Sequence, residues 1–201
     1  MKIIEIEGLD KSGKHTQSKL LAEYLRSLGY KVVQSEFHRY DTPTGKLIRD
    51  YLYKTYETND KTIELIMTAD KVAQQEWFNQ LRQEGVDFLI LDRYIGSQMS
   101  YALAKGQSID FVKTLASLVV QPNLSIMLDI SPELSISRKG KHGENDRYES
   151  DRAFLTKVRE QYFTYFSWQP NKRYILHDLD EATPQQVSIK MKHLVKSFFL
   201  L

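Results

Sequence analysis

The sequence predicts an α/β protein of three layers, in which a five-stranded parallel sheet is flanked by helices. Two observations predict this class. Short apolar segments alternate with longer amphipathic ones along the chain, and a glycine-containing turn joins the first apolar segment to the first amphipathic one. A chain of 201 residues is long enough for one domain with a sizeable core. We therefore expect a single domain over residues 1–201.

The apolar segments are expected to form the strands. The clearest is Phe88–Leu91, which is apolar throughout, as is typical of a strand that is buried on both faces. The other expected strands are Lys2–Glu7, Tyr30–Phe37, Leu124–Asp129 and Tyr174–Leu176.

The amphipathic segments are expected to form the helices, because apolar residues such as Leu21 and Leu25 recur at helical spacing. Thr183, Pro184 and Gln186 match the N-cap, N1 and N3 positions of a helix start. The helices are expected from 14 to near 29, at 44–55, 61–84, 97–105, 109–120 and 152–168, from 132 over a short stretch, and from 184 to the end. The polar stretch 139–150 between them is expected to be a mobile loop.

The composition restricts the possible environments and partners. The chain contains no cysteine, so disulfides and cysteine-based zinc sites are excluded, and no apolar run reaches the roughly 18 residues of a membrane span. The N-terminal residues do not resemble a signal peptide. A net charge of +2 does not by itself imply nucleic-acid binding. We expect a cytoplasmic protein with no membrane or nucleic-acid partner.

A candidate phosphate-binding loop lies between the first strand and the first helix. Glycines at positions 8 and 13 allow the backbone to bend around an anion, and the N-terminus of the following helix adds its positive dipole end. Lys14 is placed to reach the β- and γ-phosphates of a nucleotide. The loop residues are Gly8, Leu9, Asp10, Lys11, Ser12, Gly13, Lys14, His15 and Thr16.

The loop departs from the full phosphate-loop motif at one position. That motif has Ser or Thr directly after the lysine as a magnesium ligand, whereas this chain has His15 there and a hydroxyl only at Thr16. Magnesium is then expected to be held without a ligand from this position, or with Thr16 in a changed role.

Four segments together resemble the thymidylate kinase family of P-loop nucleoside-monophosphate kinases. The loop from Gly8 to Gln17 is the first, and Asp92-Arg93-Tyr94 at the end of a buried strand is the second. The others are Leu128–Glu133, followed by Arg138, and Asp146–Glu149. The resemblance implies transfer of the γ-phosphate of ATP to dTMP, with Mg²⁺ as cofactor and a homodimer as the assembly. The amphipathic segments Lys61–Glu84 and Ile109–Val120 are candidates for the dimer interface.

The resemblance also implies roles for individual residues. Lys14, Lys11, Arg93 and Asp10 would be catalytic, with Asp10 accepting a hydrogen bond from the 3′-hydroxyl of dTMP. Ser97 and Tyr101 would face the thymidine. On the ATP side, Arg138 and the loop 139–150 would form a lid, Asp178 would begin the adenine-binding loop, and Asp92 would hold the metal through water.

The acceptor side differs most from the family pattern. Met67 stands where the family usually has an aromatic residue that stacks on thymine, and Phe37 is a possible substitute. Lys71 stands where an arginine often reads the base, and lysine lacks the planar fork of arginine. Arg39 is the candidate for holding the acceptor phosphate. These changes predict a relaxed preference for the acceptor base.

Two other functions remain open at the level of the sequence. A deoxynucleoside kinase would use a carboxylate base at the end of the second strand, and Glu36 lies there. A nucleotide-binding regulatory protein with weak catalysis would be consistent with His15 in the loop. Comparing thymidine with dTMP as acceptors separates the first alternative from dTMP phosphorylation.

Overall fold

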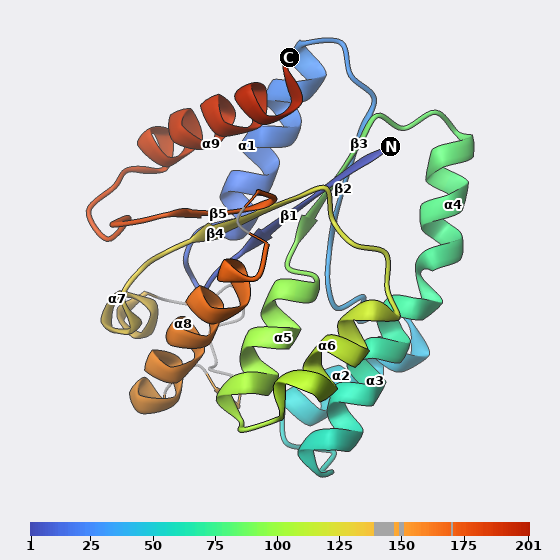
Figure 1. The fold of residues 1–201 in the computed structure, drawn as a ribbon, viewed down its shortest axis with the longest axis vertical. Helices are drawn as coiled ribbons and strands as arrows, with labels where there is room; N and C mark the ends of the chain where they lie inside the picture. Colours follow the sequence, from blue (N-terminus) through green and yellow to red (C-terminus); the bar gives the residue numbers. More distant parts are fainter. Residues whose placement is uncertain (139–146, 149–150, 170) are drawn as a thin grey trace.

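A computed structural model describes residues 1–138, 147–148, 151–169 and 171–201. Within these residues, five parallel strands form one sheet in the order β2-β3-β1-β4-β5 (Figure 1). The predicted five-stranded parallel sheet is therefore confirmed. The strands are β1 (Lys2–Glu7), β2 (Val32–Glu36), β3 (Phe88–Asp92), β4 (Leu124–Leu128) and β5 (Arg173–Leu176).

Helices cover both faces of the sheet, which gives three layers. Helices α1 and α9 lie together on one face, and α5 and α8 lie together on the other (Figure 1). The helices of the described residues are α1 (Lys14–Ser27), α2 (Pro43–Leu52), α3 (Asp60–Ala73), α4 (Gln75–Gln83), α5 (Ile95–Ala104), α6 (Ile109–Ser117), α7 (Pro132–Ser137), α8 (Arg152–Ser167) and α9 (Pro184–Phe199).

The prediction of one continuous helix over Lys61–Glu84 is wrong. The chain turns at Gln74, which ends α3 and precedes α4. The Lys71 carbonyl there accepts the Gln74 backbone N–H at 3.2 Å and the side-chain Nε2 of Gln75 at 2.7 Å. In a regular helix the Lys71 carbonyl would accept the backbone N–H four residues further on, that of Gln75. Here the Gln75 side chain takes part in that hydrogen bonding, and the helix is interrupted.

The predicted start of the last helix is confirmed. The Thr183 hydroxyl accepts the Gln186 backbone N–H at 3.3 Å, and the Gln186 side chain accepts the Thr183 N–H at 2.8 Å. Pro184 occupies the first helical turn, where a missing N–H removes no helical hydrogen bond.

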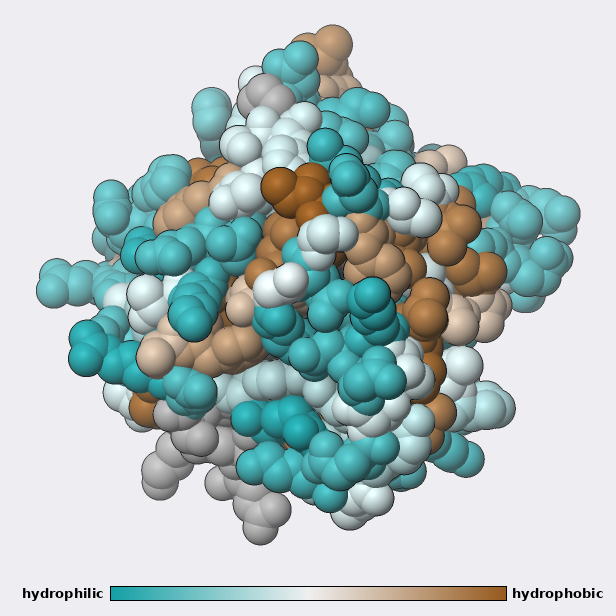
Figure 2. Space-filling model, turned by 60° about the horizontal axis from the view of Figure 1, so that its bottom comes forward, coloured by the Kyte–Doolittle hydropathy of each residue, from teal (hydrophilic) through white to brown (hydrophobic). Residues whose placement is uncertain are grey.

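Strand β1 is central in the sheet and lies in the core along nearly its whole length. Ile4 and Ile6 are fully buried, and so are the two carboxylates Glu5 and Glu7 between and after them. The surface in Figure 2 is mostly hydrophilic, with apolar residues in scattered patches. None of the helices in the described part of the chain has both the length and the apolar character that a membrane span requires.

Glu5 is held in the core by neutral hydrogen-bond partners. Its Oε1 accepts the Ser125 hydroxyl at 2.6 Å, and its Oε2 accepts the Ile95 backbone N–H at 3.0 Å. Burial, reinforced by the charge of Glu7, raises the pKa of Glu5 from its usual value near 4.5 to about 8. The neutral form of Glu5 is therefore favoured in the folded state.

Replacing Glu5 with glutamine is expected to raise the free energy of unfolding at alkaline pH. A folded-state pKa above the unfolded one contributes stability that is fully present below pH 4.5 and is lost as pH rises to about 8. Urea titrations across this range should show that the free energy of unfolding differs between variant and wild type. This difference should be smallest near pH 4.5 and widest at about pH 8. A difference that is independent of pH would contradict this account.

Candidate active site

The phosphate-binding loop follows β1 and leads into α1 at the carboxyl edge of the sheet. Three of its residues have positive φ angles: 137° at Gly8, 61° at Lys11 and 95° at Gly13. No side chain caps the N-terminus of α1 at Gly13, and its first turn carries no acidic residue. The loop thus leaves the positive end of the helix dipole available to an anion, as a phosphate site requires.

Lys14 lies inside this loop, with its side chain almost completely buried. Its Nζ donates to the carbonyl oxygens of Leu9 at 2.6 Å and Gly8 at 3.2 Å. Burial, together with the charge of Arg93, lowers the pKa of Lys14 to about 8. The loop therefore concentrates a cation where the phosphates of a nucleotide would bind.

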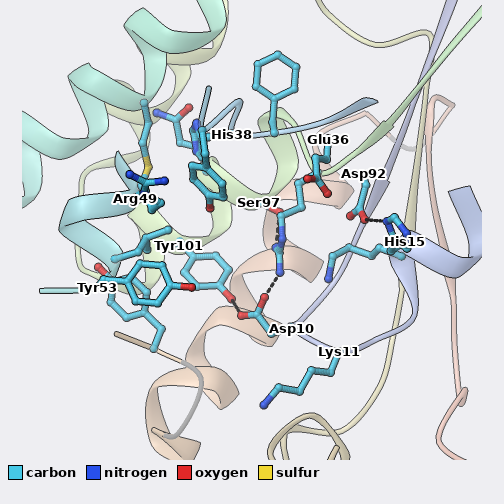
Figure 3. Close-up of a pocket in the computed structure, with 18 of the residues that line it drawn as sticks. Asp10, Lys11, His15, Glu36, His38, Arg49, Tyr53, Asp92, Ser97 and Tyr101 are labelled. Carbon is cyan, nitrogen blue, oxygen red and sulfur yellow. Dashed lines mark hydrogen bonds and ion pairs between the residues drawn. The ribbon is translucent and has the colours of Figure 1, made fainter. Parts of the chain in front are cut away.

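A hydrogen-bonded network joins the phosphate loop to the end of β3 and to α5. Arg93 pairs through Nη2 with Asp10 and donates through Nη1 to the Ser97 hydroxyl at 2.8 Å. The Tyr101 hydroxyl donates to the other Asp10 oxygen at 2.9 Å (Figure 3). Although burial opposes ionisation of Asp10, Arg93 and Lys14 outweigh it and lower the pKa of this carboxyl. Asp10 is thus held as a carboxylate.

Glu7 supports this network from the core. It accepts hydrogen bonds from the Ser97 hydroxyl, from the Tyr162 hydroxyl at 3.2 Å and from the Tyr94 backbone N–H at 2.8 Å. Sequence reasoning missed this residue. The signal was present, since a second carboxylate in an otherwise apolar first strand is unusual for a buried sheet.

A cavity of about 740 Å³ extends from the phosphate loop to α3, past the Asp10–Arg93 pair. Such a volume is in the usual range for small-molecule sites. The predicted site residues that line it are Asp10, Lys11, Gly13, Lys14, His15, Phe37, Met67, Asp92, Arg93, Ser97, Tyr101 and Arg138. Sequence segments that are far apart are therefore brought to one concave site.

Several predicted site residues do not line the cavity. Gly8, Leu9 and Ser12 form the frame of the loop, and Thr16 is exposed on α1. Asp178 is exposed after β5, with φ of 57°.

The predicted roles of Arg39 and Lys71 in acceptor binding have no support from their positions. Arg39 donates to Gln74 at 3.2 Å and to Asp41 at 3.1 Å, and it lines a smaller hollow next to the main cavity. Lys71 is buried; its Nζ donates to the Met67 carbonyl at 3.4 Å, and burial lowers its pKa to about 8. Both side chains are thus engaged outside the main cavity.

The cavity also contains residues that sequence reasoning did not assign. Arg49 points into it from α2, and its nearest carboxylate, Asp50, is 3.9 Å away (Figure 3). The sequence carries only a weak signal for Arg49, because a basic residue on a predicted helix can face either the cavity or the solvent. Packing decides which face of α2 meets the cavity. Other lining residues without a predicted role are His38, Leu52, Tyr53, Glu64, Gln98, Lys105 and Tyr148.

The predicted lid lies mostly outside the described residues, which include only Arg147 and Tyr148 of the stretch 139–150. Arg147 donates through Nε to the Tyr51 carbonyl at 3.1 Å, and the Tyr148 hydroxyl lies 2.9 Å from that of Tyr51. Nearby, Arg138 donates to the Lys11 carbonyl at 2.9 Å. These contacts hold two cationic residues near the phosphate loop and the end of α2.

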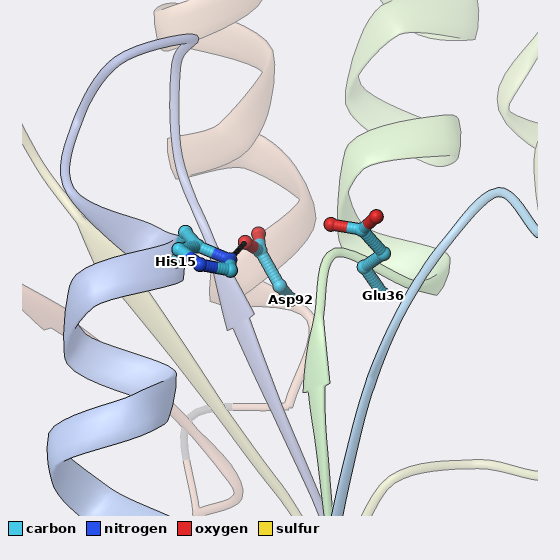
Figure 4. A group of neighbouring side chains, drawn as sticks. All are labelled: His15, Glu36 and Asp92. Carbon is cyan, nitrogen blue, oxygen red and sulfur yellow. Dashed lines mark ion pairs between the residues drawn. The ribbon is translucent and has the colours of Figure 1, made fainter. Parts of the chain in front are cut away.

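One group of side chains has the chemistry of a metal site. His15, Glu36 and Asp92 place their ligand atoms within 4.8 Å of one another, and His15 Nδ1 lies 3.8 Å from Asp92 Oδ2 (Figure 4). Asp92 was predicted near the metal, whereas Glu36 was not. These residues fit a divalent cation beside the phosphate loop, while Thr16 is not part of the group.

A phosphate loop at the carboxyl edge of a parallel sheet, with cations around a cavity that extends to a second subsite, defines a P-loop nucleotide kinase. Sequence comparison specifies the family. The family model described as thymidylate kinase matches residues 6–187, so the chain belongs to the thymidylate kinase family.

Individual relatives agree with this assignment. A thymidylate kinase of Schizosaccharomyces pombe is 36% identical over 148 residues, which are 74% of this chain and 69% of that protein. A probable thymidylate kinase of Pyrobaculum aerophilum is 31% identical over 98% of this chain and 97% of its own. The structure of thymidylate kinase from Candida albicans, described as revealing the origin of broad substrate specificity, superposes with a TM-score of 0.82 at 28% identity, covering 98% and 91% of the two chains.

Proposed function

We propose that this chain transfers the γ-phosphoryl group of ATP to the phosphate of dTMP, giving dTDP and ADP. An oxygen of the dTMP phosphate attacks the γ-phosphorus in line, and the bond to the β,γ-bridging oxygen breaks as ADP leaves. This chemistry needs positioning and charge neutralisation more than a covalent intermediate. The observation that carries the proposal is the Asp10–Arg93 network, which lies between the phosphate loop and the remote end of the cavity.

The two ends of the cavity have different roles in this proposal. ATP phosphates bind at Gly13 and Lys14, where backbone N–H groups and an ammonium face the same space. Lys11 and Arg138 add positive charge beside the transferred group. A divalent cation, expected to be Mg²⁺ from the family resemblance, would bind at Asp92 and supply charge neutralisation at the phosphate oxygens.

At the acceptor end, Arg93 steadies the phosphate of dTMP, and Asp10 receives the hydrogen bond of its 3′-hydroxyl. Tyr101 and Ser97 hold both charged groups in place. The base would contact Phe37 and Met67, which line the cavity beyond the network. Because Met67 stacks less rigidly than an aromatic ring, we retain a relaxed acceptor base as part of the proposal.

The direct test is a coupled ADP-release assay with ATP and each of the common monophosphates, with thymidine included as an acceptor. We expect turnover of dTMP with some activity on other deoxynucleotides. Turnover of thymidine without dTMP would instead favour a deoxynucleoside kinase with Glu36 as its base. ATP affinity without transfer to any acceptor would favour a regulatory protein.

Because Arg49 lines the cavity and Arg39 does not, Arg49 replaces Arg39 in the proposal. Arg49, on α2, would hold the phosphate of dTMP. Substituting Arg49 with alanine is expected to raise KM for dTMP about 10- to 100-fold, since a charge-assisted hydrogen bond contributes about 1.5–3 kcal/mol. Arg39→Ala is the matched control, because Arg39 lines the smaller hollow and not the main cavity, and less than about a threefold change is expected there. Steady-state kinetics with dTMP varied give KM for dTMP in both variants and so decide which arginine holds the acceptor. A larger effect at Arg39 would return the role to that residue.

The assembly and location complete the proposal. Leu65 on α3 and Ile109 and Leu118 around α6 are about half exposed, at 52%, 48% and 57%, on the helices predicted to form a dimer interface. Apolar side chains of this size are commonly covered in homodimers. Light scattering of the purified protein should give twice the 23.5 kDa of one chain. The chain length favours a single kinase domain over 1–201, and the family resemblance implies a lid at 139–150. The composition favours a cytoplasmic location.

A further inference from the structure

Three potential metal ligands meet at the carboxyl edge of the sheet. Asp92 ends β3, Glu36 ends the neighbouring strand β2, and His15 is in the first turn of α1 (Figure 4). Each offers an oxygen or nitrogen donor, and the three donors lie within 4.8 Å of one another. Two atoms that bind one ion at about 2.0–2.2 Å are at most about 4.4 Å apart, so small side-chain rotations would complete the site. His15 and Glu36 are exposed, so little packing opposes such rotations.

The neighbouring cations hydrogen-bond groups other than these carboxylates, although Lys14 is close enough to Asp92 for the two charges to interact. Arg93 is bound to Asp10 and Ser97, and the Lys14 ammonium donates to two loop carbonyls. Among the described residues, the ion pair of Asp92 is with His15, and Glu36 has none. Within the described part of the chain, two carboxylates and an imidazole therefore lie together without a guanidinium or ammonium group within salt-bridge distance.

A second His–Asp pair in the molecule shows the contrast. His177 Nδ1 lies 3.4 Å from Asp129 Oδ2, and the exposed fraction of its side chain, 59%, equals that of His15. Asp129, however, is paired at 2.6 Å and 3.0 Å with the guanidinium of Arg159. The Asp129 carboxylate is already neutralised by this guanidinium. Among the described residues, His177 and Asp129 do not belong to a group of three potential metal ligands, so this pair lacks the third ligand that Glu36 supplies beside His15 and Asp92.

We propose that His15, Glu36 and Asp92 form a direct-coordination site that takes a first-row transition-metal dication in preference to Mg²⁺, already in the nucleotide-free protein. Imidazole nitrogen is a good ligand for transition-metal dications, whereas Mg²⁺ prefers an all-oxygen shell and gives up its waters reluctantly. A histidine in place of the loop hydroxyl thus shifts the selectivity of the site away from Mg²⁺.

Binding itself depends on these three side chains alone and not on the proposed reaction. A consequence for phosphoryl transfer does rest on the proposed function, because the same ion would then neutralise the phosphate oxygens of ATP. Metal affinity and catalysis are accordingly measured separately, so that failure of one is distinguishable from failure of the other.

Mn²⁺ is a stringent probe, since it binds most weakly in the first-row series. Free Mn²⁺ is followed by electron paramagnetic resonance as nucleotide-free protein is titrated at pH 7.5, and Mg²⁺ affinity is obtained by competition. We expect Mn²⁺ to bind at least about tenfold more tightly than Mg²⁺, and His15→Ser to weaken Mn²⁺ binding by at least about tenfold. Because serine restores the usual hydroxyl ligand, Mg²⁺ affinity should change less than about twofold in that variant.

His177→Ser is the matched control and should leave both affinities unchanged. Glu36→Gln should weaken Mn²⁺ binding without loss of the folded state, which circular dichroism monitors. The proposal is overturned if the wild-type protein binds the two ions equally or binds no Mn²⁺ without nucleotide. It is likewise overturned if His15→Ser retains full Mn²⁺ affinity. If Mn²⁺ binds as expected but dTMP is not phosphorylated, the metal site stands and the proposed function fails.

Discussion

Replacing Arg93 with alanine is expected to lower kcat/KM for dTMP by about three orders of magnitude. In the proposed function, the substitution removes the cation that would face the reacting phosphates, and the loss of one such group typically costs about 10²- to 10³-fold or more in rate. It also removes the ion-pair partner of the Asp10 carboxylate, which in the described residues then keeps a side-chain hydrogen bond only from Tyr101. Both losses act on the same subsite, so KM and kcat are expected to change together.

Arg93→Lys separates charge from geometry in this experiment. Lysine keeps the positive charge but cannot bond Asp10 and Ser97 at the same time through a planar fork, so an intermediate loss is expected. Steady-state kinetics with dTMP and ATP varied in turn measure the effect, and thermal unfolding checks the fold. A loss below about threefold for Arg93→Ala would remove Arg93 from the catalytic group.

Gly8→Ala is expected to lower the free energy of unfolding by about 3 kcal/mol or more and to abolish ATP binding. The φ angle of Gly8 is 137°, which L-residues rarely adopt. An added Cβ would lie 2.5 Å from the Leu128 carbonyl oxygen and 2.9 Å from the Ser12 hydroxyl. Because the first contact is backbone in a buried strand, the loop rather than the strand must move, and the phosphate site moves with it.

Gly106→Ala is the matched control for backbone strain alone. Its φ angle is 85°, and an added Cβ there would meet nothing within 4 Å. A cost of about 1–2 kcal/mol is therefore expected, without an effect on nucleotide binding. Chemical denaturation gives the two free energies, and calorimetric titration with an ATP analogue gives the affinity. Equal losses in both variants would show that the contact with Leu128 is not what makes Gly8 necessary.

The strand order of the sheet explains why the residues of the candidate site lie together. Strand β1 lies between β3 and β4, so the loop after β1 lies beside the ends of both neighbours. Asp92 pairs in register with Ile6 and Glu36, and this register brings the end of β2 within reach of the phosphate loop. Parallel strands place their carboxyl ends at one edge, which is where ligands of open α/β sheets bind.

Local patterns in the sequence determined the class of fold and the position of the phosphate loop. Apolar strands such as Phe88–Asp92 and the helix start at Thr183 depend on neighbouring residues, so they could be predicted closely. The family resemblance also pointed to Arg93, Ser97 and Tyr101, which do line one cavity. These features can be predicted from the sequence because backbone geometry and hydrophobic spacing act over a few residues.

Only the tertiary structure decided which distant side chains share the site. The interruption at Gln74 involves the Gln75 side chain, which also accepts the distant Val120 backbone N–H at 3.0 Å. The buried position of Glu7 depends on partners from α5 and α8. Whether Arg39 or Arg49 faces the cavity follows from how α2 packs against α3, which spacing alone does not encode. The proximity of His15 in α1 to Glu36 at the end of β2 likewise depends on how these elements pack. Long-range packing orients side chains that local periodicity leaves undetermined, because each orientation depends on neighbours far away in the sequence.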